Sequence, residues 1–170
     1  MLFRSKNQSI LLGAAVYTVA GLITGFLAIN GGQSAQYFVA ALCCLSALAG
    51  PFAGVWHYTS THNLTIPAGT GAGIGAAAVV VGGLISYAIT KLLQLANVYP
   101  SDAEMVERQR DDMIAQGMEP EAVEQAMGFA EMFQGVGGFA INLVIAAVIG
   151  AIGGAIAASI FKKGTADYEV

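Results

Sequence analysis

The sequence predicts an all-α, polytopic membrane protein with four transmembrane helices and an extramembrane helical hairpin between the third and fourth spans. Two observations predict this class. Only 11% of the 170 residues are charged and 56% are hydrophobic, whereas a soluble domain carries about a quarter charged residues. Four apolar runs are also long enough to cross a bilayer core as helices, which takes about 20 residues each. We treat residues 1–170 as one membrane domain into which the hairpin is inserted.

The four runs contain no Asp, Glu, Lys or Arg, and their apolar residues are continuous rather than alternating. Backbone that crosses hydrocarbon must be helical or part of a closed barrel, because unpaired amides are too costly there. Continuous apolar runs favour helices over barrel strands, whose residues alternate. The predicted spans are residues 9–29, 37–56, 67–90 and 136–161.

The orientation follows from the basic residues near the span ends, because Lys and Arg accumulate on the cytoplasmic side. Arg4, Lys6, Lys162 and Lys163 predict that both termini are cytoplasmic. Residues 58–66 then form a cytoplasmic loop. The first apolar run is longer than the roughly 7–15 residues of a cleavable signal peptide, so we expect it to stay as an uncleaved span.

Gly71, Gly73 and Ala76 match the G-x-G-x-x-G/A spacing of a dinucleotide-binding loop. That loop follows a strand and needs an acidic residue about 20 residues later. Here a polar stretch precedes the glycines and the first acid is Asp102, so we expect no cofactor. Small residues four apart instead let helices approach closely in lipid. Such pairs occur in every predicted span: Gly21 with Gly25, Gly50 with Gly54, Gly71 with Gly75, and Gly150 with Gly154.

Residues 101–133, called here the acidic segment, hold nine of the eleven acidic residues but only two of the seven basic ones. Ser101 followed by Glu104 is a capping box, which marks the start of a helix. Gly117 is a typical helix stop and Pro120 a typical first-turn residue. The segment is therefore predicted to form two helices, at about residues 102–116 and 120–133, that pair as an external hairpin.

Five of the six methionines lie in this segment. Thioethers bind soft Cu(I) and also make adaptable contacts with proteins. Copper sites usually group methionines closely or add His or Cys, so packing within the hairpin is the favoured interpretation and a partner-binding face is the next. The rows that would pack are Met105, Gln109 and Met113 on the first helix, Val123, Met127, Ala130 and Gln134 on the second, and Phe129 with Phe133.

Few other residues could carry chemistry. Cys43 and Cys44 are adjacent, which strains a disulfide, and we interpret them as buried small hydrophobes. His57 and His62 lack Cys or carboxylate neighbours, so we expect no metal site. We also expect no ionisable side chain at membrane depth. Asn142 is the best candidate for a functional polar contact inside the membrane, ahead of the hydroxyls of Thr18, Thr24, Ser46, Ser86 and Thr90.

Three stretches carry a resemblance to a known family. They are M-x-x-x-G-M-x-x-E-x-x-E-Q-A-M at residues 113–127, AIAASIFKK at 155–163 and YPSD at 99–102. In these, and in the order of its spans, the chain resembles the bacterial family of small membrane proteins called domain of unknown function 4199. The resemblance covers most of the chain and implies four spans with a hairpin before the last. Because the family has no established activity, it implies no catalytic residue.

These patterns favour a structural or accessory, complex-forming membrane protein over an enzyme, which would need a positioned nucleophile, base or metal. The expected partners are the lipid bilayer and either a membrane protein complex or further copies of the chain, with no nucleic acid. The alternative is a subunit of a small-molecule transporter or channel. A proton-coupled transporter, however, normally carries an ionisable residue inside a span.

Overall fold

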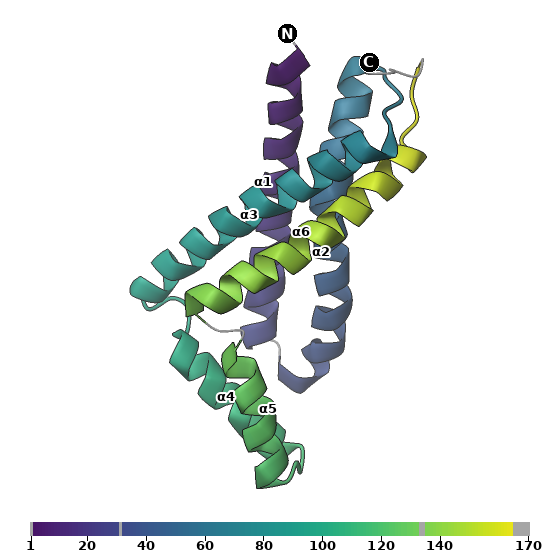
Figure 1. The fold of residues 1–170 in the computed structure, drawn as a ribbon. Helices are drawn as coiled ribbons and strands as arrows, with labels where there is room; N and C mark the ends of the chain where they lie inside the picture. Colours follow the sequence, from purple (N-terminus) through teal and green to yellow (C-terminus); the bar gives the residue numbers. More distant parts are fainter. Residues whose placement is uncertain (1, 31, 133–134, 165–170) are drawn as a thin grey trace. The chain divides into compact units, whose positions relative to one another are not determined.

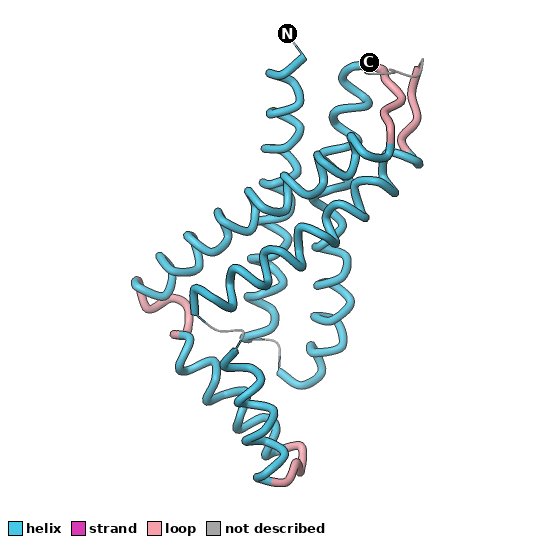
Figure 2. Tube along the Cα trace, viewed as in Figure 1, coloured by secondary structure: helices cyan, strands magenta, loops and turns pink. Residues whose placement is uncertain are grey.

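The computed structural model describes residues 2–30, 32–132 and 135–164 (Figure 1). No strand occurs among these residues (Figure 2), so the all-α prediction is confirmed. The helices of this described part are α1 Leu2–Asn30, α2 Gly32–His62, α3 Ala68–Leu95, α4 Asp102–Ala115, α5 Pro120–Met132 and α6 Gly135–Ile160.

Four of these helices are long and apolar enough to cross a membrane, as predicted. Many of their large apolar side chains, such as Phe26 and Leu92, are exposed, which suits a surface covered by lipid. The chain therefore fits a multi-pass membrane protein. The spanning stretches are Lys6–Asn30, Ala41–His62, Ala68–Leu95 and Gly137–Ile160.

The second span is longer than predicted, because α2 continues without interruption to His62. The helix ends where Asn63 adopts a left-handed conformation, with φ of 54°. The Leu64 amide then donates to the Thr59 carbonyl at 3.1 Å, which is the hydrogen bond of a Schellman cap. The predicted loop over residues 58–66 is therefore wrong in its first half, which is helical.

The third span also passes its predicted end at residue 90 and continues to Leu95. Here Asn97 is the left-handed residue, with φ of 54°. The Val98 amide donates to the Leu93 carbonyl at 3.0 Å. Both helix ends thus use asparagine, which tolerates this conformation better than most residues other than glycine.

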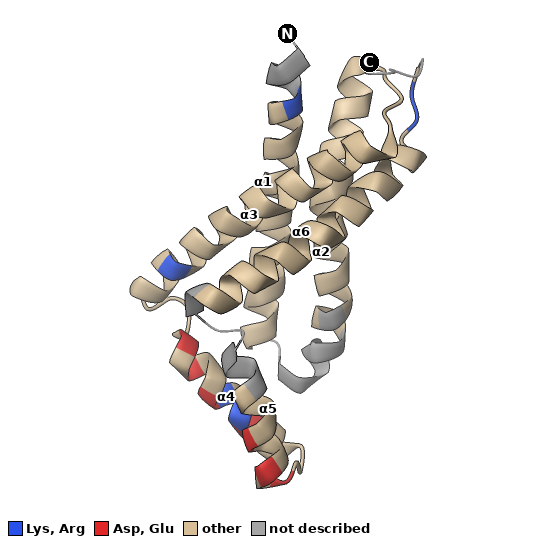
Figure 3. Cartoon of the chain, in the orientation of Figure 1, with Lys and Arg blue, Asp and Glu red and all other residues tan. Residues whose placement is uncertain are grey.

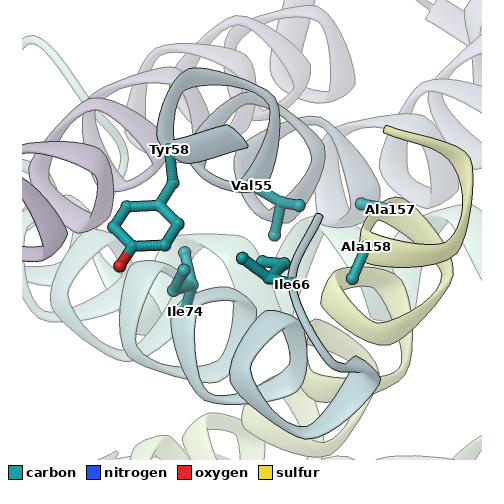
Figure 4. Close-up of a cluster of buried hydrophobic side chains, with 6 residues drawn as sticks. All are labelled: Val55, Tyr58, Ile66, Ile74, Ala157 and Ala158. Atoms are coloured by element: carbon teal, nitrogen blue, oxygen red, sulfur yellow. The ribbon is translucent and has the colours of Figure 1, made fainter. Parts of the chain in front are cut away.

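The chain divides into two compact units, Met1–Ser86 with Ile145–Val170, and Tyr87–Val144. In the first unit a buried cluster joins α2, the turn after it, α3 and α6 (Figure 4). Phe52 and Phe161 pack edge to face at its border, with ring centroids 5.9 Å apart. The cluster consists of Val55, Tyr58, Ile66, Ile74, Ala157 and Ala158.

In the second unit, α4 and α5 contact each other. The predicted capping box is present: Ser101 Oγ accepts from the Glu104 amide at 3.3 Å, and the Glu104 carboxylate accepts from the Ser101 amide at 2.7 Å. Gly117, with φ of 80°, ends the first helix as predicted. Val123 and Met127 of α5 are buried, whereas α4 has no buried residue. Almost all of α4 is therefore surface.

Candidate functional site

Glycines bring α3 and α6 into backbone contact within the first unit. A methyl group added at Gly71 would overlap the carbonyl oxygen of Gly154, and one at Gly75 would overlap that of Gly150. A methyl group at Gly150 would lie 2.7 Å from Val79 Cγ2. Because real Cβ contacts essentially never fall below 3.0 Å, only glycine fits here without movement of a neighbour. The geometry is the close approach through small residues that packs helices in lipid.

The glycines of α2 lie against α1. A methyl group at Gly50 would lie 2.7 Å from Tyr17 Cβ, and one at Gly54 would lie 3.0 Å from the carbonyl oxygen of Ser9. On α1 the corresponding glycine is Gly13, where a methyl group would lie 2.7 Å from the Gly50 carbonyl oxygen. Gly13 was not among the glycine pairs found from the sequence.

The glycine pair predicted for α1 is Gly21 with Gly25. A methyl group at Gly21 would meet only Ser86 Oγ, at 3.8 Å, which is an ordinary van der Waals contact. Gly25 is half-buried. The approach of α3 to α1 runs instead through Gly82, where a methyl group would lie 2.8 Å from the Ala14 carbonyl oxygen.

The glycines that resemble a dinucleotide-binding loop all lie inside α3. The backbone of α6 occupies the space where a Cβ of residue 71 would lie, whereas a methyl group at Gly73 would meet nothing within 4 Å. The two glycines therefore face different surroundings and do not line one cradle.

Several hydroxyl groups inside the spans bond to helix backbone. Thr18 Oγ1 donates to the Gly82 carbonyl at 3.1 Å and so joins α1 to α3. Thr24 and Ser46 donate to carbonyls of their own helices, at 2.8 and 2.9 Å. Ser86 Oγ is buried and has no partner among the described residues.

Asn142 lies in the spanning stretch of α6 and is exposed. Within the described residues its amide makes no hydrogen bond. Thr90 of α3 is half-buried. The polar contact predicted for Asn142 is therefore not made inside one copy of the described chain.

The helices that could cross a membrane extend beyond the predicted spans, and α2 includes His57 and His62. His57 Nδ1 lies 2.9 Å from Ser9 Oγ, which is buried in α1. The His62 ring packs against Tyr58 at 5.3 Å, and its buried Nε2 has no partner in the described part of the chain. Among the described residues no three His, Cys, Asp or Glu gather as a metal site would require.

Cys43 and Cys44 are exposed free thiols on α2. The interpretation of these residues as buried hydrophobes is therefore wrong. Both lie within the spanning stretch of α2, where lipid would cover small apolar side chains as well as a protein core does.

Three polar side chains tie the end of α3 to the start of α4; we call Lys91, Gln94 and Asp102 the Lys91 clasp. Lys91 Nζ donates to Asp102 Oδ2 at 2.6 Å and to Gln94 Oε1 at 3.0 Å. Gln94 Nε2 donates to Asp102 Oδ1 at 2.9 Å and to the Pro100 carbonyl at 3.0 Å. The hydrogen bond from Lys91, followed by that from Gln94, holds the pKa of the Asp102 carboxyl below its usual value.

An aromatic pair lies next to this clasp. Tyr87 of α3 stacks on Phe139 of α6, with centroids 4.2 Å apart and planes 28° apart. The Lys91 ammonium lies 5.5 Å from the Tyr87 ring centroid, within the range of a cation–π interaction. Sequence reasoning did not find the clasp, because its members come from different elements and form no motif.

The acidic side chains described by the structure are confined to α4, α5 and the turn between them (Figure 3). Met105 and Met118 are exposed, Met113 is half-buried and Met127 is buried. The methionines therefore do not form a single buried row. The predicted row members Phe129, Ala130, Phe133 and Gln134 lie outside the residues whose side chains the structure describes.

Neither a scan against protein-family models nor searches of curated proteins and of solved structures found a match to this chain.

Proposed function

We propose that the chain is a small integral membrane protein with a structural or accessory role, in which a glycine-packed helix bundle carries the acidic segment outside the membrane for contact with a partner protein. In this proposal the termini are cytoplasmic, the membrane is a bacterial inner membrane and the protein is not an enzyme. The observation that carries it is α4, a helix with no buried residue in a segment that holds nine acids and two arginines. A helix with no fully buried residue leaves most of its surface available to a partner.

The composition of the acidic segment indicates what kind of partner it fits. Ile114 and Met118 are exposed near the turn between α4 and α5, and Glu119 and Glu121 follow them directly. Apolar and Met contacts inside a charged rim are typical of protein interfaces. Charge complementarity steers association and suppresses wrong partners. The partner therefore presents a basic surface with an apolar centre.

The test is recovery of partner proteins in a mild detergent. Replacing residues 102–132 with a short Gly-Ser linker leaves membrane insertion intact and removes the partner from the purified material. Glu119→Gln with Glu121→Gln weakens recovery without removing the segment. Asp167→Asn with Glu169→Gln neutralises the two acids outside the acidic segment, is the matched pair of charge changes and leaves recovery unchanged. A partner that is retained at full yield without the segment would refute the proposal.

A transporter or channel subunit is the second candidate, and the pair of His57 with Ser9 is the observation that favours it. A titratable group hydrogen-bonded between two spans is typical of proton-coupled pathways. Under the first proposal, the protein reconstituted alone in liposomes carries no proton-driven flux of small cations. Gradient-driven uptake that is lost in His57→Gln or Asn142→Leu would favour the transporter instead.

A further inference from the structure

One face of α6 carries a regular seam of exposed residues. Counting from Asn142, they recur at alternating steps of three and four, the spacing of positions a and d in helices that pack side by side. All the apolar members are isoleucine, and each has between 41% and 56% of its surface exposed. The seam, as we name it here, consists of Asn142, Ile145, Ile149, Ile152 and Ile156.

Isoleucine exposed on a spanning helix is explained by lipid alone, but Asn142 is not. Its amide offers two donors and an acceptor, and it makes no hydrogen bond within the described residues. The exposed Ser159 of the same helix differs, because its hydroxyl donates to the Ala155 carbonyl at 3.1 Å. In hydrocarbon an unpaired polar group is costly, and polar side chains in spans are usually paired with another helix.

The carboxamide of Asn142 and the common direction in which all copies insert into the bilayer indicate that the seam binds a second copy of this chain. A carboxamide is its own complement, since it donates and accepts at once, so a second Asn142 satisfies the first. All copies of one membrane protein insert in the same direction, and their α6 helices are therefore parallel. Parallel alignment about a two-fold axis along the membrane normal brings each seam residue opposite itself, as isologous contacts require.

We propose that two copies of the chain associate through parallel α6 helices, with isoleucines interdigitated along the seam and Asn142 hydrogen-bonded to Asn142 across the axis. A heptad spacing favours the left-handed crossing that is common in membrane bundles. A single polar residue at an a position fixes the register of such a pair. This self-association is independent of the partner contact assigned to the acidic segment.

Cysteine crosslinking in membranes tests the contact. In a background with Cys43→Ala and Cys44→Ala, Ile145→Cys on the seam crosslinks two copies on mild oxidation. Val144→Cys lies at the same depth and is more exposed, at 64%, but it is off the seam and stays uncrosslinked. Asn142→Leu, added to Ile145→Cys, weakens dimerisation by about threefold to thirtyfold, the range measured for one interhelical hydrogen bond in lipid. Val144→Leu, the matched change off the seam, has no such effect.

The outcomes separate this proposal from random collision and from the proposed function. Equal crosslinking at positions 144 and 145, or dimerisation unchanged by Asn142→Leu, would overturn it. A chain that stays monomeric even at a high ratio of protein to lipid would also overturn the proposal. Replacing residues 102–132 with a linker leaves the crosslink in place, so a failure of partner binding and a failure of self-association are distinguishable.

Discussion

At the scale of single residues, neighbouring glycines of α3 have opposite surroundings. A methyl group at Gly75 would overlap the carbonyl oxygen of Gly150, whereas one at Gly73 would meet nothing within 4 Å. Glycine in a helix interior is less favourable than alanine by about 1 kcal/mol. Alanine therefore improves the helix at both positions, and only at Gly75 does it meet another backbone.

We expect Gly75→Ala to destabilise the bundle by about 1–3 kcal/mol, the usual cost of overpacking a well-filled contact. Gly73→Ala leaves stability unchanged or raises it by up to about 1 kcal/mol. Thermal unfolding in mild detergent, followed by circular dichroism, measures both. If the two variants shifted in the same direction, close packing would not be the role of Gly75.

At the scale of elements, the Lys91 clasp fixes the end of α3 to the start of α4. The pKa of Asp102 is lowered from 3.8, so the clasp contributes fully above the unfolded-state pKa and is lost as the pH falls through the folded-state value. The Asp102 side chain is 48% exposed and the Lys91 side chain is 37% exposed. Solvent-exposed pairs of this kind contribute at most about 1 kcal/mol.

Amide hydrogen exchange at the start of α4 reports the clasp. At neutral pH we expect Asp102→Asn to speed this exchange by a fewfold, because the ion pair and its hydrogen bonds are weakened. As the pH falls through the lowered folded-state pKa of Asp102, the wild type and Asp102→Asn become alike, apart from the intrinsic pH dependence of exchange. Asp111→Asn, in the middle of α4, is the control and has no effect at neutral pH or in acid. A difference that persists unchanged in acid would assign the effect to something other than the carboxylate.

Four helices and their approximate positions were predictable because a span is defined by length and apolar composition alone. The exact helix ends were not, because they depend on Asn63 and Asn97 taking a left-handed conformation, which many asparagines do not. The Gly–Gly spacing found the contact of α3 with α6 but missed Gly13 and Gly82. A wider search for any small residues four apart includes both, through Ser9 before Gly13 and through Ala78 and Ser86 around Gly82.

The contacts between elements were beyond sequence reasoning. The Ser9–His57 hydrogen bond joins residues 48 positions apart, and no motif connects them. The same holds for the Lys91 clasp, whose aspartate belongs to another helix. Asn142 was predictable as an unusual residue, because an amide in an apolar run is costly. That Asn142 is exposed, and therefore belongs to the seam, was visible only in the structure.

At the scale of the molecule, the first part of α1 and the residues just after α6 both contact the last turns of α2 or the turn that follows it, within the first unit. Ser9, near the start of α1, is hydrogen-bonded to His57 of α2. Lys163, just after α6, donates through Nζ to Ser60 Oγ of α2 at 3.2 Å. Thr65 Oγ1, in the turn after α2, donates to the Lys163 carbonyl at 3.3 Å. An even number of spans requires this arrangement, because both termini must then lie on one side of the membrane.

Which side that is follows from charge. The sequence has no acidic residue before Asp102. The residues before the first span and after the last one include the basic residues Arg4, Lys6, Lys162 and Lys163. Basic residues are retained in the cytoplasm, so we predict cytoplasmic termini and an external acidic segment. In a background lacking Cys43 and Cys44, a membrane-impermeant thiol reagent applied to intact cells should label Gln116→Cys and spare Lys162→Cys until the cells are opened. Both positions are exposed, so the difference reports the side of the membrane and not burial. Labelling of Lys162→Cys alone would invert the orientation, and labelling of both would contradict an even number of spans.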